Sequence, residues 1–410
     1  MMPEETVVIG GAGHAGVQSA VRLRELGWPG RITMIAPDSD LPYERPPLSK
    51  HFLASGSAEE VVPLRRAGYF EDKRIERVCG RIRQVVPDGR YVLLDNGARY
   101  DYAKLVLALG SEARNLAVPG GDLPGVHRLK TREDAGALKK ALRRGTRVVV
   151  VGAGYIGLEV AAAAAALGCE TTILEIADRA MNRVTSEPVS RFFEQLHREH
   201  GTELYFGTAV TEIRGEGAVQ EVVTSDGAIH PADVVVVGIG VVPSQNVARD
   251  CGLRVDDGIV VDHDGRTGHP DIYAAGDVTR LKADGVDLRL ESIQSAVSQA
   301  ARAADHIMGL PPGKREVPWF WTIQHGVRLQ TAGLRRPDDT VLVRTHESGQ
   351  FSVLYLRAGR LAAIDAVGTL RDFNAGKKLI GAGARLDPRR AADSFAKLSD
   401  AVEESAVSEI

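Results

Sequence analysis

Two stretches of the chain show the same order of apolar and polar positions. The first opens with an apolar run from Val7 to Ile9, passes through a glycine-rich segment, and continues from Val17 to Leu26 with apolar residues at helical spacing. A further apolar run over 31–36 ends just before Asp38. This order predicts a buried parallel strand, a tight loop, an amphipathic helix and a second strand that ends beside a carboxylate.

The same order returns in the middle of the chain. An apolar strand over 147–151 precedes a second glycine-rich segment, an alanine-rich helix that reaches Leu167, and a strand that ends at Glu175. Asp38 follows Gly16, the last glycine of its loop, by 22 residues, and Glu175 follows Gly157 by 18. An internal repeat of this kind predicts two α/β units built on one plan.

Both glycine-rich segments fit the spacing G-x-G-x-x-G. In such a loop the first glycine makes the tight turn, the second lets the backbone approach a pyrophosphate, and the third allows the helix to pack closely on the sheet. The phosphate then lies at the helix N-terminus, where free N–H groups and the dipole favour anions. The pattern predicts two dinucleotide sites, at Gly11, Gly13, His14, Ala15 and Gly16 and at Gly152, Gly154, Tyr155, Ile156 and Gly157.

The carboxylate at the end of the second repeat bears on which dinucleotide binds there. Glu175 can accept a hydrogen bond from a free ribose 2′-hydroxyl and would repel a 2′-phosphate, which favours NADH over NADPH. Arg183 follows a few residues later, and an arginine either serves a 2′-phosphate or is a solvated charge at a helix start. Its presence weakens the prediction of NADH without reversing it.

Other predicted strands also end at candidate ligand positions, because open α/β sheets bind ligands at the carboxyl ends of their strands. The run 104–109 ends at Gly110, the run 233–237 leads into Ile239 and Gly240, and the run 271–275 leads into Gly276 and Asp277. Asp277 either bonds a ligand hydroxyl or caps the helix predicted over 291–308.

Two charged residues each allow two interpretations. Lys50 ends the segment 42–50, which adjacent prolines stiffen, and it lies either on a rigid surface loop or beside a cofactor ring. Glu159 falls in the first turn of the second helix, where a carboxylate suits the helix dipole and where a bound nicotinamide would lie. The residue pattern alone does not choose between these interpretations.

Composition narrows the class of protein. With 410 residues, 44% of them hydrophobic and 26% charged, the chain is long enough for two or three domains with sizeable cores. The net charge of −3 argues against nucleic-acid binding, and the N-terminus has neither the basic start nor the apolar core of a signal peptide. No apolar helix candidate is long enough to span a bilayer. We therefore expect a soluble cytoplasmic protein that binds neither nucleic acid nor membrane.

The cysteines argue against thiol chemistry. Cys79, Cys169 and Cys251 are far apart and form no C-x-x-C pair. The chain therefore lacks the dithiol through which flavin disulphide reductases pass electrons. We expect no metal site.

The composition changes after Pro318. Trp319 and Trp321 lie close together, alternating strand patterns follow over 326–358, and a helix is expected over 371–382. Residues 328–390 hold twelve Lys and Arg against six Asp and Glu, a local excess of +6. Such a stretch is either a solvated face or a docking face for an acidic partner.

Together these motifs resemble those of the FAD-containing, pyridine-nucleotide-dependent ferredoxin reductases that serve Rieske-type dioxygenases and bacterial P450 systems. The putidaredoxin reductase and biphenyl dioxygenase reductase type fits best, over nearly the whole chain. The most specific pieces are PYERPPLSK (42–50), VVVVGAGYIGLEVAA (148–162), IYAAGDVTR (272–280), RLES (289–292) and PWFW (318–321). The resemblance implies an α/β fold with two Rossmann-like dinucleotide-binding domains, for FAD (1–113 and 245–316) and NAD (114–244), and a C-terminal α+β domain (317–410).

The resemblance also implies site residues by position. The residues implied for FAD are Gly11, Gly13, Ala15, Gly16, Asp38, Arg45, Lys50, Ile82, Ala108, Lys130, Gly276, Asp277, Ile293 and Trp321. Those implied for NADH are Gly152, Gly154, Ile156, Gly157, Glu175, Arg183, Ile239 and Gly240. The family pairs the lysine of PPLSK with the glutamate of GYIGLE beside the flavin and the nicotinamide. Lys50 and Glu159 are therefore the expected catalytic pair.

The activity implied is transfer of a hydride from NADH to FAD and then of single electrons to a [2Fe–2S] ferredoxin that feeds a P450 or Rieske-type oxygenase. We expect transient, electrostatically steered docking and a monomer or weak homodimer. The alternatives are an NADH-responsive flavoprotein of the apoptosis-inducing-factor kind and a rubredoxin reductase. An NADH oxidase or peroxidase is disfavoured because residues 39–60 hold no cysteine.

Three positions depart from the pattern usual in the resembled family. Leu109 stands where threonine is usual, Pro37 occupies a place that is often acidic, and Ile323 replaces an aspartate after Trp321. These departures bear on flavin tuning and on the partner more than on the fold.

Overall fold

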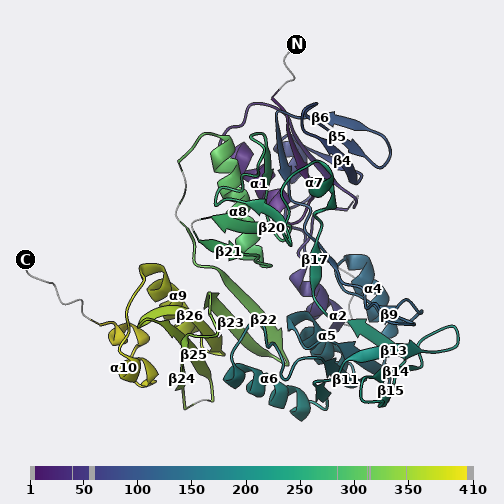
Figure 1. Ribbon diagram of the computed structural model, residues 1–410, viewed down its shortest axis with the longest axis vertical. Helices are drawn as coiled ribbons and strands as arrows, with labels where there is room; N and C mark the ends of the chain where they lie inside the picture. Colours follow the sequence, from purple (N-terminus) through teal and green to yellow (C-terminus); the bar gives the residue numbers. More distant parts are fainter. Residues whose placement is uncertain are drawn as a thin grey trace, which may run out of the picture. The chain divides into compact units, whose positions relative to one another are not determined.

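The computed structural model describes residues 5–38, 40–54, 61–283, 285–311, 313, 315–347 and 349–403 (Figure 1). The chain divides into two compact units, each assembled from three stretches. Unit 1 consists of Met1–Arg45, Val61–Glu112 and Val241–Arg315, and unit 2 of Pro46–Glu60, Ala113–Gly240 and Glu316–Ile410. The first repeat therefore lies in unit 1 and the second in unit 2.

The first repeat builds the central sheet of unit 1. Its five parallel strands lie in the order β19 (Ile272–Ala274), β7 (Lys104–Leu107), β1 (Val7–Gly10), β2 (Ile32–Ala36) and β3 (Ile75–Cys79). All four residues of β1 are buried, because apolar clusters cover both faces of the sheet. On one face α1 (His14–Glu25) packs against α8 (Ile293–Ile307), with Ala20 and Ala300 fully buried in that cluster.

Smaller elements complete unit 1. An antiparallel sheet contains β4 (Ile82–Val86), β5 (Tyr91–Leu94) and β6 (Arg99–Asp101), and another contains β18 (Ile259–Val261), β20 (Thr279–Ala283) and β21 (Val286–Leu288), with β18 parallel to β20. The remaining elements are β17 (Val241–Pro243), α3 (Tyr69–Asp72), α7 (Asn246–Asp250) and β8 (Ser111–Ala113), whose last residue already belongs to unit 2.

The second repeat builds an equivalent sheet in unit 2. Its parallel strands lie in the order β12 (Glu203–Phe206), β11 (Glu170–Glu175), β10 (Arg147–Val151), β16 (Val234–Val237) and β9 (Val126–His127). The helices of this part are η1 (Pro46–Ser49), α2 (His51–Ala54), α4 (Arg132–Ala141), α5 (Tyr155–Ala166) and α6 (Glu187–Glu199). A small antiparallel sheet contains β13 (Val210–Arg214), β14 (Glu221–Thr224) and β15 (Ile229–Pro231).

The last part of unit 2 is an antiparallel sheet with helices. The strands lie in the order β22 (Trp319–Gln324), β23 (Val327–Gly333), β26 (Arg360–Val367), β25 (Phe351–Arg357) and β24 (Thr340–Thr345). The helices are α9 (Leu370–Ala382), α10 (Pro388–Ala392) and η2 (Leu398–Ala401). Phe373 of α9 belongs to the same buried apolar cluster as Ile364 and Leu354, which forms the core of this part.

The structure confirms the expected fold class: two Rossmann-like α/β parts followed by an α+β part. The helix expected over 291–308 is α8, and the helix expected over 371–382 is α9. Among the described residues, no helix has both the length and the apolar character needed to cross a bilayer. The domain bounds expected from the resemblance stay a prediction beside the two units.

Candidate functional site

The loop between β1 and α1 has the geometry that a bound pyrophosphate requires. Gly11 has a φ of +111°, and a Cβ built on it would lie 2.1 Å from the carbonyl oxygen of Ala108. A Cβ on Gly16 would lie 1.9 Å from the carbonyl oxygen of Gly11, whereas one on Gly13 would meet nothing within 4 Å. The outer glycines are therefore needed for packing, and the middle one leaves open space at the helix start.

The N-terminus of α1 is also left available. Gly13 is its N-cap, no side chain caps it, and its first turn holds no acidic residue. The free N–H groups and the dipole therefore favour an anion there. The residues present fit a dinucleotide such as FAD at this loop.

The second loop repeats this geometry in unit 2. A Cβ on Gly152 would lie 2.7 Å from the carbonyl oxygen of Gly238, and one on Gly157 would lie 2.0 Å from that of Gly152. A Cβ on Gly154, the N-cap of α5, would again meet nothing within 4 Å. Ile156, in the first turn of α5, exposes 45% of its surface. The residues present fit a second dinucleotide, such as NAD.

Polar residues gather at the carboxyl end of the unit 1 sheet. Asp277 follows β19, and its carboxylate accepts a hydrogen bond from Ser111 Oγ at 3.0 Å. Burial lowers the pKa of the His14 imidazole, nearby Arg45 lowers it further, and Asp277 opposes both. Gly276 lies against Ala15, since a Cβ on it would lie 3.0 Å from that of Ala15. The structure thus brings together predicted residues from three distant segments of the chain.

The other residues expected at the FAD site lie on unit 1 or at its strand ends, with three exceptions. Asp38 is exposed two residues after β2, and Ile82 Cδ1 lies 2.7 Å from the Cβ that Gly10 would carry. Lys50, Lys130 and Trp321 belong to unit 2. The backbone N–H of Lys130 donates to Asp134 Oδ2 at 3.0 Å, beside the capped start of α4.

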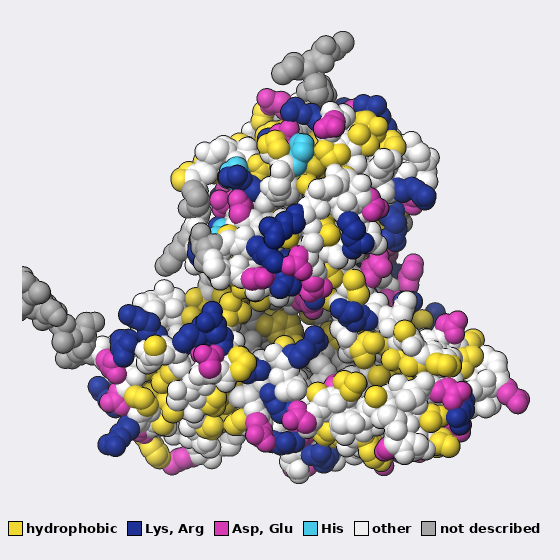
Figure 2. All heavy atoms as spheres, viewed as in Figure 1, with side chains coloured by type: hydrophobic (Ala, Val, Ile, Leu, Met, Phe, Trp, Pro, Cys, Tyr) yellow, Lys and Arg dark blue, Asp and Glu magenta, His cyan; other side chains and the backbone are white. Residues whose placement is uncertain are grey.

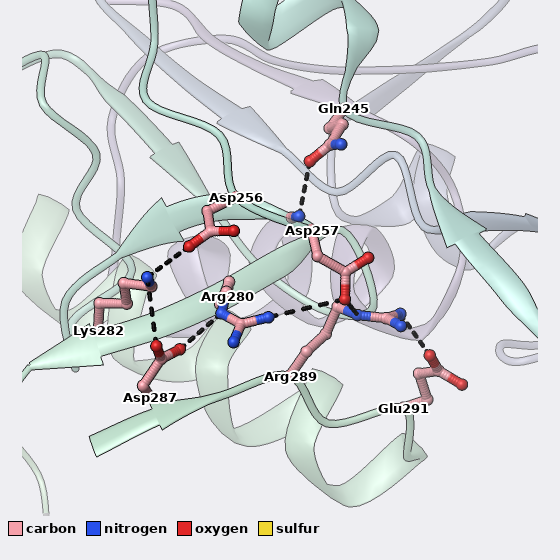
Figure 3. Close-up of polar contacts among 9 residues, drawn as sticks. Gln245, Asp256, Asp257, Arg280, Lys282, Asp287, Arg289 and Glu291 are labelled. Carbon is pink, nitrogen blue, oxygen red and sulfur yellow. Dashed lines mark hydrogen bonds and ion pairs between the residues drawn. The ribbon is translucent and has the colours of Figure 1, made fainter.

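Figure 3 shows a ladder of alternating charges in unit 1 that was not expected from the sequence. Its members are Asp256, Lys282, Asp287, Arg280, Asp257, Arg289 and Glu291. Arg289 pairs with Asp257 at 3.1 Å and with Glu291, its neighbour in RLES. The ladder therefore fixes the segment that leads to Ser292, the N-cap of α8, and to Ile293, a residue expected at the flavin.

The best-defined polar centre of unit 2 is the carboxylate of Glu159, which is 2% exposed. Lys50 Nζ lies 2.7 Å from Oε2, and the hydroxyl of Ser49 donates to the same oxygen at 2.5 Å. The hydroxyl of Thr322, on β22, donates to Oε1 at 2.6 Å. Both oxygens are therefore satisfied by groups from two distant segments, which holds a buried charge in one orientation.

This centre rules out the surface-loop interpretation of Lys50, and Glu159 lies in the second turn of α5 rather than in the first turn, where it was expected. Neither side chain lies on a solvated face, because Lys50 is 20% and Glu159 1% exposed in their side chains and each is the ion-pair partner of the other. Ser49 and Thr322 were not expected. Ser49 is the serine of PPLSK, so its place next to Lys50 in the sequence could have indicated that it belongs to the same centre. Thr322 lies 163 residues from Glu159, and no local pattern indicates its contact.

The residues expected at the ribose of NADH also come together. Glu175 accepts the backbone N–H of Ala153 at 2.6 Å and that of Ala177 at 2.7 Å, so it joins the second loop to the segment after β11. Arg183 Nη2 lies 3.6 Å from the Cβ that Gly240 would carry, which places the guanidinium beside Gly240. Ile239 lies against Gly152, because its Cγ2 is 3.4 Å from the Cβ built there.

A second buried carboxylate anchors the segment that carries Arg183. Asp365 of β26 accepts the hydroxyl of Tyr355 at 2.5 Å and that of Thr185. The Tyr355 hydroxyl also lies 2.8 Å from Ser186 Oγ. Burial raises the pKa of Asp365 to about 6. None of these residues carries a sequence motif, so only the folded chain reveals the anchor.

Aromatic side chains of β22 pack on one another and on Tyr155, the first residue of α5. The ring of Tyr155 lies 4.6 Å from that of Phe320, and the ring of Trp321 lies 5.7 Å from that of Trp319. The ammonium of Lys377, on α9, lies 5.0 Å from the centre of the Trp319 ring. Within the described ranges, His, Cys, Asp and Glu side chains form no group of three or more with a metal-binding arrangement.

Comparisons with known proteins agree with this geometry. Residues 5–300 match the family described as pyridine nucleotide-disulphide oxidoreductase, and residues 319–402 match the family described as reductase C-terminal. A ferredoxin–NAD(P)+ reductase of a Sphingomonas species is 41% identical over 93% of this chain and 94% of its own.

Two solved structures extend the comparison. The ferredoxin reductase for the CYP199A2 system of Rhodopseudomonas palustris is 39% identical, with a TM-score of 0.93 over 97% of this chain and 100% of its own. Putidaredoxin reductase in its covalent complex with putidaredoxin is 36% identical, with a TM-score of 0.93 over 97% of each chain.

Proposed function

We propose, on the premise that the chain belongs to the pyridine nucleotide-disulphide oxidoreductase family and within it to the ferredoxin reductases, that it passes electrons from NADH to a [2Fe–2S] ferredoxin. As a member of that family the protein is an oxidoreductase with FAD and NAD(H) as cofactors. A P450 or a Rieske-type oxygenase is the terminal acceptor that we propose.

The observation that carries the proposal is the buried Glu159 centre beside the second glycine-rich loop. Glu159 lies two residues after Gly157, in the second turn of α5, the helix whose open N-terminus suits a pyrophosphate. When bound, FAD supplies the step that the side chains lack, because it accepts two electrons as a hydride and releases them singly. The side chains themselves need to bind, orient and hold charge.

Lys50 and Glu159 have complementary roles in this proposal. The ammonium and the carboxylate hold each other at 2.7 Å, and the carboxylate is further held by Ser49 and Thr322. Such a pair can exchange partners when a nicotinamide amide approaches, which would orient the nicotinamide. No nucleophile and no metal is needed.

Glu175 supports NADH as the donor. Its carboxylate, already fixed by two backbone N–H groups, presents negative charge where a 2′-phosphate would lie and retains lone pairs for a 2′-hydroxyl. Arg183 lies beside Gly240, and its positive charge would instead attract a 2′-phosphate. We therefore propose a preference for NADH that both residues set.

An anaerobic titration of the purified protein with NADH, and separately with NADPH, tests the proposal through the flavin absorption bands. Full bleaching by NADH and little by NADPH is expected. Glu175→Gln should reduce the difference in flavin bleaching between NADH and NADPH, and the control Arg183→Gln should increase that difference. If neither nucleotide bleaches the flavin promptly, the reductase function is overturned. If both bleach it equally, only the role of Glu175 is overturned.

The surface around α9 and α10 supports docking of an acidic partner. Figure 2 shows Lys and Arg side chains gathered over this part of the molecule. We define the α9–α10 basic surface as Arg371, Lys377, Lys378, Arg389 and Arg390. Electrostatic steering by such a surface speeds encounter without strong final binding, which suits a transient electron-transfer complex. The ferredoxin type, the monomer or weak homodimer and the cytoplasmic location remain predictions.

A further inference from the structure

A line of hydrogen bonds runs away from Glu159 through unit 2. Thr322 Oγ1 contacts Glu159 Oε1 at 2.6 Å, and Gln324 Nε2 contacts Thr322 Oγ1 at 3.3 Å. Gln324 Oε1 lies 3.0 Å from His197 Nε2, and His197 Nδ1 lies 3.3 Å from His325 Nε2. The line therefore joins a carboxylate on α5 to imidazoles on α6 and at the end of β22.

The chemistry of the groups fixes the direction of every bond. The carboxylate only accepts, so the Thr322 hydroxyl donates to it and must itself accept from the Gln324 amide N–H. Gln324 Oε1 must then accept from His197 Nε2–H. The other nitrogen of a neutral His197 carries no proton and accepts from His325 Nε2–H. All four donors point towards Glu159.

Both imidazoles are neutral at ordinary pH, as this direction requires. Burial lowers the pKa of His197 to about 4, opposed by its bond to Gln324 and assisted by His200. Burial also lowers the pKa of His325 to about 4, assisted by His197 and His200. The ring of His200, exposed at the end of α6, stacks on that of His325 at 3.9 Å.

Titratable side chains face Glu159 from two neighbouring parts of unit 2. Lys50, which follows η1, pairs with the carboxylate at 2.7 Å. Tyr155, on α5, also lies close enough for its charge to interact with Glu159, and burial raises its pKa well above the usual value. Tyr155 therefore stays neutral, and the contacts of the Glu159 carboxylate include the ion pair with Lys50 and the hydrogen bond from Thr322.

The outer end of the line lies at an unusual backbone position. His325 and Gly326 form the two-residue turn between β22 and β23, with φ angles of +47° and +77°. Turns with both angles positive favour Asn-Gly, because asparagine tolerates the left-handed region better than most residues do. A histidine at this position places its ring on His197, which an asparagine cannot do.

We propose that Thr322, Gln324, His197 and His325 act as positioning residues that hold the Glu159 carboxylate in the orientation it needs for its pair with Lys50. This inference rests on the proposed function, because it assigns Glu159 to the handling of the nicotinamide. The four residues touch neither the nicotinamide nor the flavin in this proposal. They act by donating hydrogen bonds in one direction, which favours the ionised carboxylate.

The first experiment measures flavin reduction by NADH in rapid mixing as a function of pH. Thr322→Val keeps the shape of the side chain but removes the donor, so the acid limb of the profile should move up by about one pH unit. Thr322→Ser keeps the hydroxyl and should return the limb to its wild-type position. His325→Asn keeps a favourable turn and should move the limb in the same direction as Thr322→Val, by less.

The second experiment tests the direction of these hydrogen bonds without NADH. In the holoenzyme labelled with 15N-histidine, imidazole NMR shifts should show His197 and His325 neutral at pH 6, each protonated on Nε2. The variants His197→Gln and His325→Asn assign the two signals. Protonation on Nδ1 of either ring, or a charged ring at pH 6, would overturn the direction of the line.

The two experiments separate the inference from the proposed function. If wild-type protein is reduced by NADH but Thr322→Val and Thr322→Ser give the same pH profile, the positioning role is overturned and the reductase function stands. If NADH does not reduce the wild-type flavin, the reductase function is overturned, and with it the assignment of the line to nicotinamide handling.

Discussion

At the scale of single residues, the centre of unit 2 is an ion pair whose two members are buried unequally. The side chain of Glu159 is 1% exposed and that of Lys50 is 20% exposed. A lysine can turn its ammonium towards water on its flexible stem, whereas the buried carboxylate has no such alternative. The two halves of the pair therefore tolerate loss of their partner to different degrees.

This asymmetry gives a prediction for the two single substitutions. Lys50→Met leaves a buried carboxylate without its counter-charge and should lower the free energy of unfolding by about 3 kcal/mol. Glu159→Gln should cost less, about 1 kcal/mol, because Lys50 can reach water. Both should slow flavin reduction by NADH by about tenfold or more while FAD stays bound. Denaturant unfolding and rapid mixing measure the two effects; equal stability losses would contradict the argument.

At the scale of elements, both dinucleotide loops depend on three glycines with different surroundings. In the second loop, a Cβ on Gly157 would overlap the carbonyl oxygen of Gly152 at 2.0 Å, whereas a Cβ on Gly154 would meet no protein atom within 4 Å. The strand, loop and helix thus need the outer glycines for their own packing, as the Cβ on Gly152 would also lie 2.7 Å from the carbonyl oxygen of Gly238. They leave the space beside another for a ligand.

Two alanine substitutions separate these roles. Gly154→Ala should fold normally and retain FAD, but weaken NADH binding by about tenfold, or about 1.4 kcal/mol, because the new methyl group occupies the space of the pyrophosphate. Gly157→Ala should destabilise the protein by about 3 kcal/mol or more. Thermal unfolding and the dissociation constant for NADH measure them. An unstable Gly154→Ala, or one with unchanged affinity, would argue against this division of roles.

At the scale of the whole molecule, the distribution of charge is uneven. The net charge is −3, yet residues 328–390 hold twelve Lys and Arg against six Asp and Glu. Part of this excess is structural, since Arg344 is fully buried and pairs with Asp372 at 3.1 Å. The remainder includes the α9–α10 basic surface, whose members are exposed except for Lys377, which is half-buried and covers the ring of Trp319. This surface is the one we expect a ferredoxin to meet.

A charge reversal tests that expectation, with putidaredoxin as the probe ferredoxin. The double variant Lys377→Glu and Lys378→Glu should slow reduction of putidaredoxin by about tenfold at low ionic strength and flatten its dependence on salt. The matched control is Lys139→Glu with Lys140→Glu, because Lys139 likewise lies over an aromatic ring, that of Phe52, at 5.1 Å. Equal effects of both pairs would show a general loss of charge rather than docking at α9. Flavin reduction by NADH, measured without putidaredoxin, isolates the first half-reaction.

The sequence by itself determined the parts of this protein whose causes are local. Apolar runs, glycine spacing and strand-end carboxylates depend on near neighbours, so the two repeats, their loops and Glu175 could be predicted from order alone. The resemblance added Lys50 and Glu159 as a pair, and the structure places them 2.7 Å apart. The net charge of residues 328–390 could be counted from the sequence. Which of these charged side chains are buried could not be predicted from it.

Only the tertiary structure decided the features that depend on distant segments. Thr322 lies 163 residues from Glu159, Gln324 lies 127 from His197, and Asp365 lies 180 from Thr185, so no local pattern could join them. Their side chains are short and polar, and they would suit many surface positions equally well. They become specific because packing removes water from around them, and a buried donor or acceptor must then find a partner within the fold.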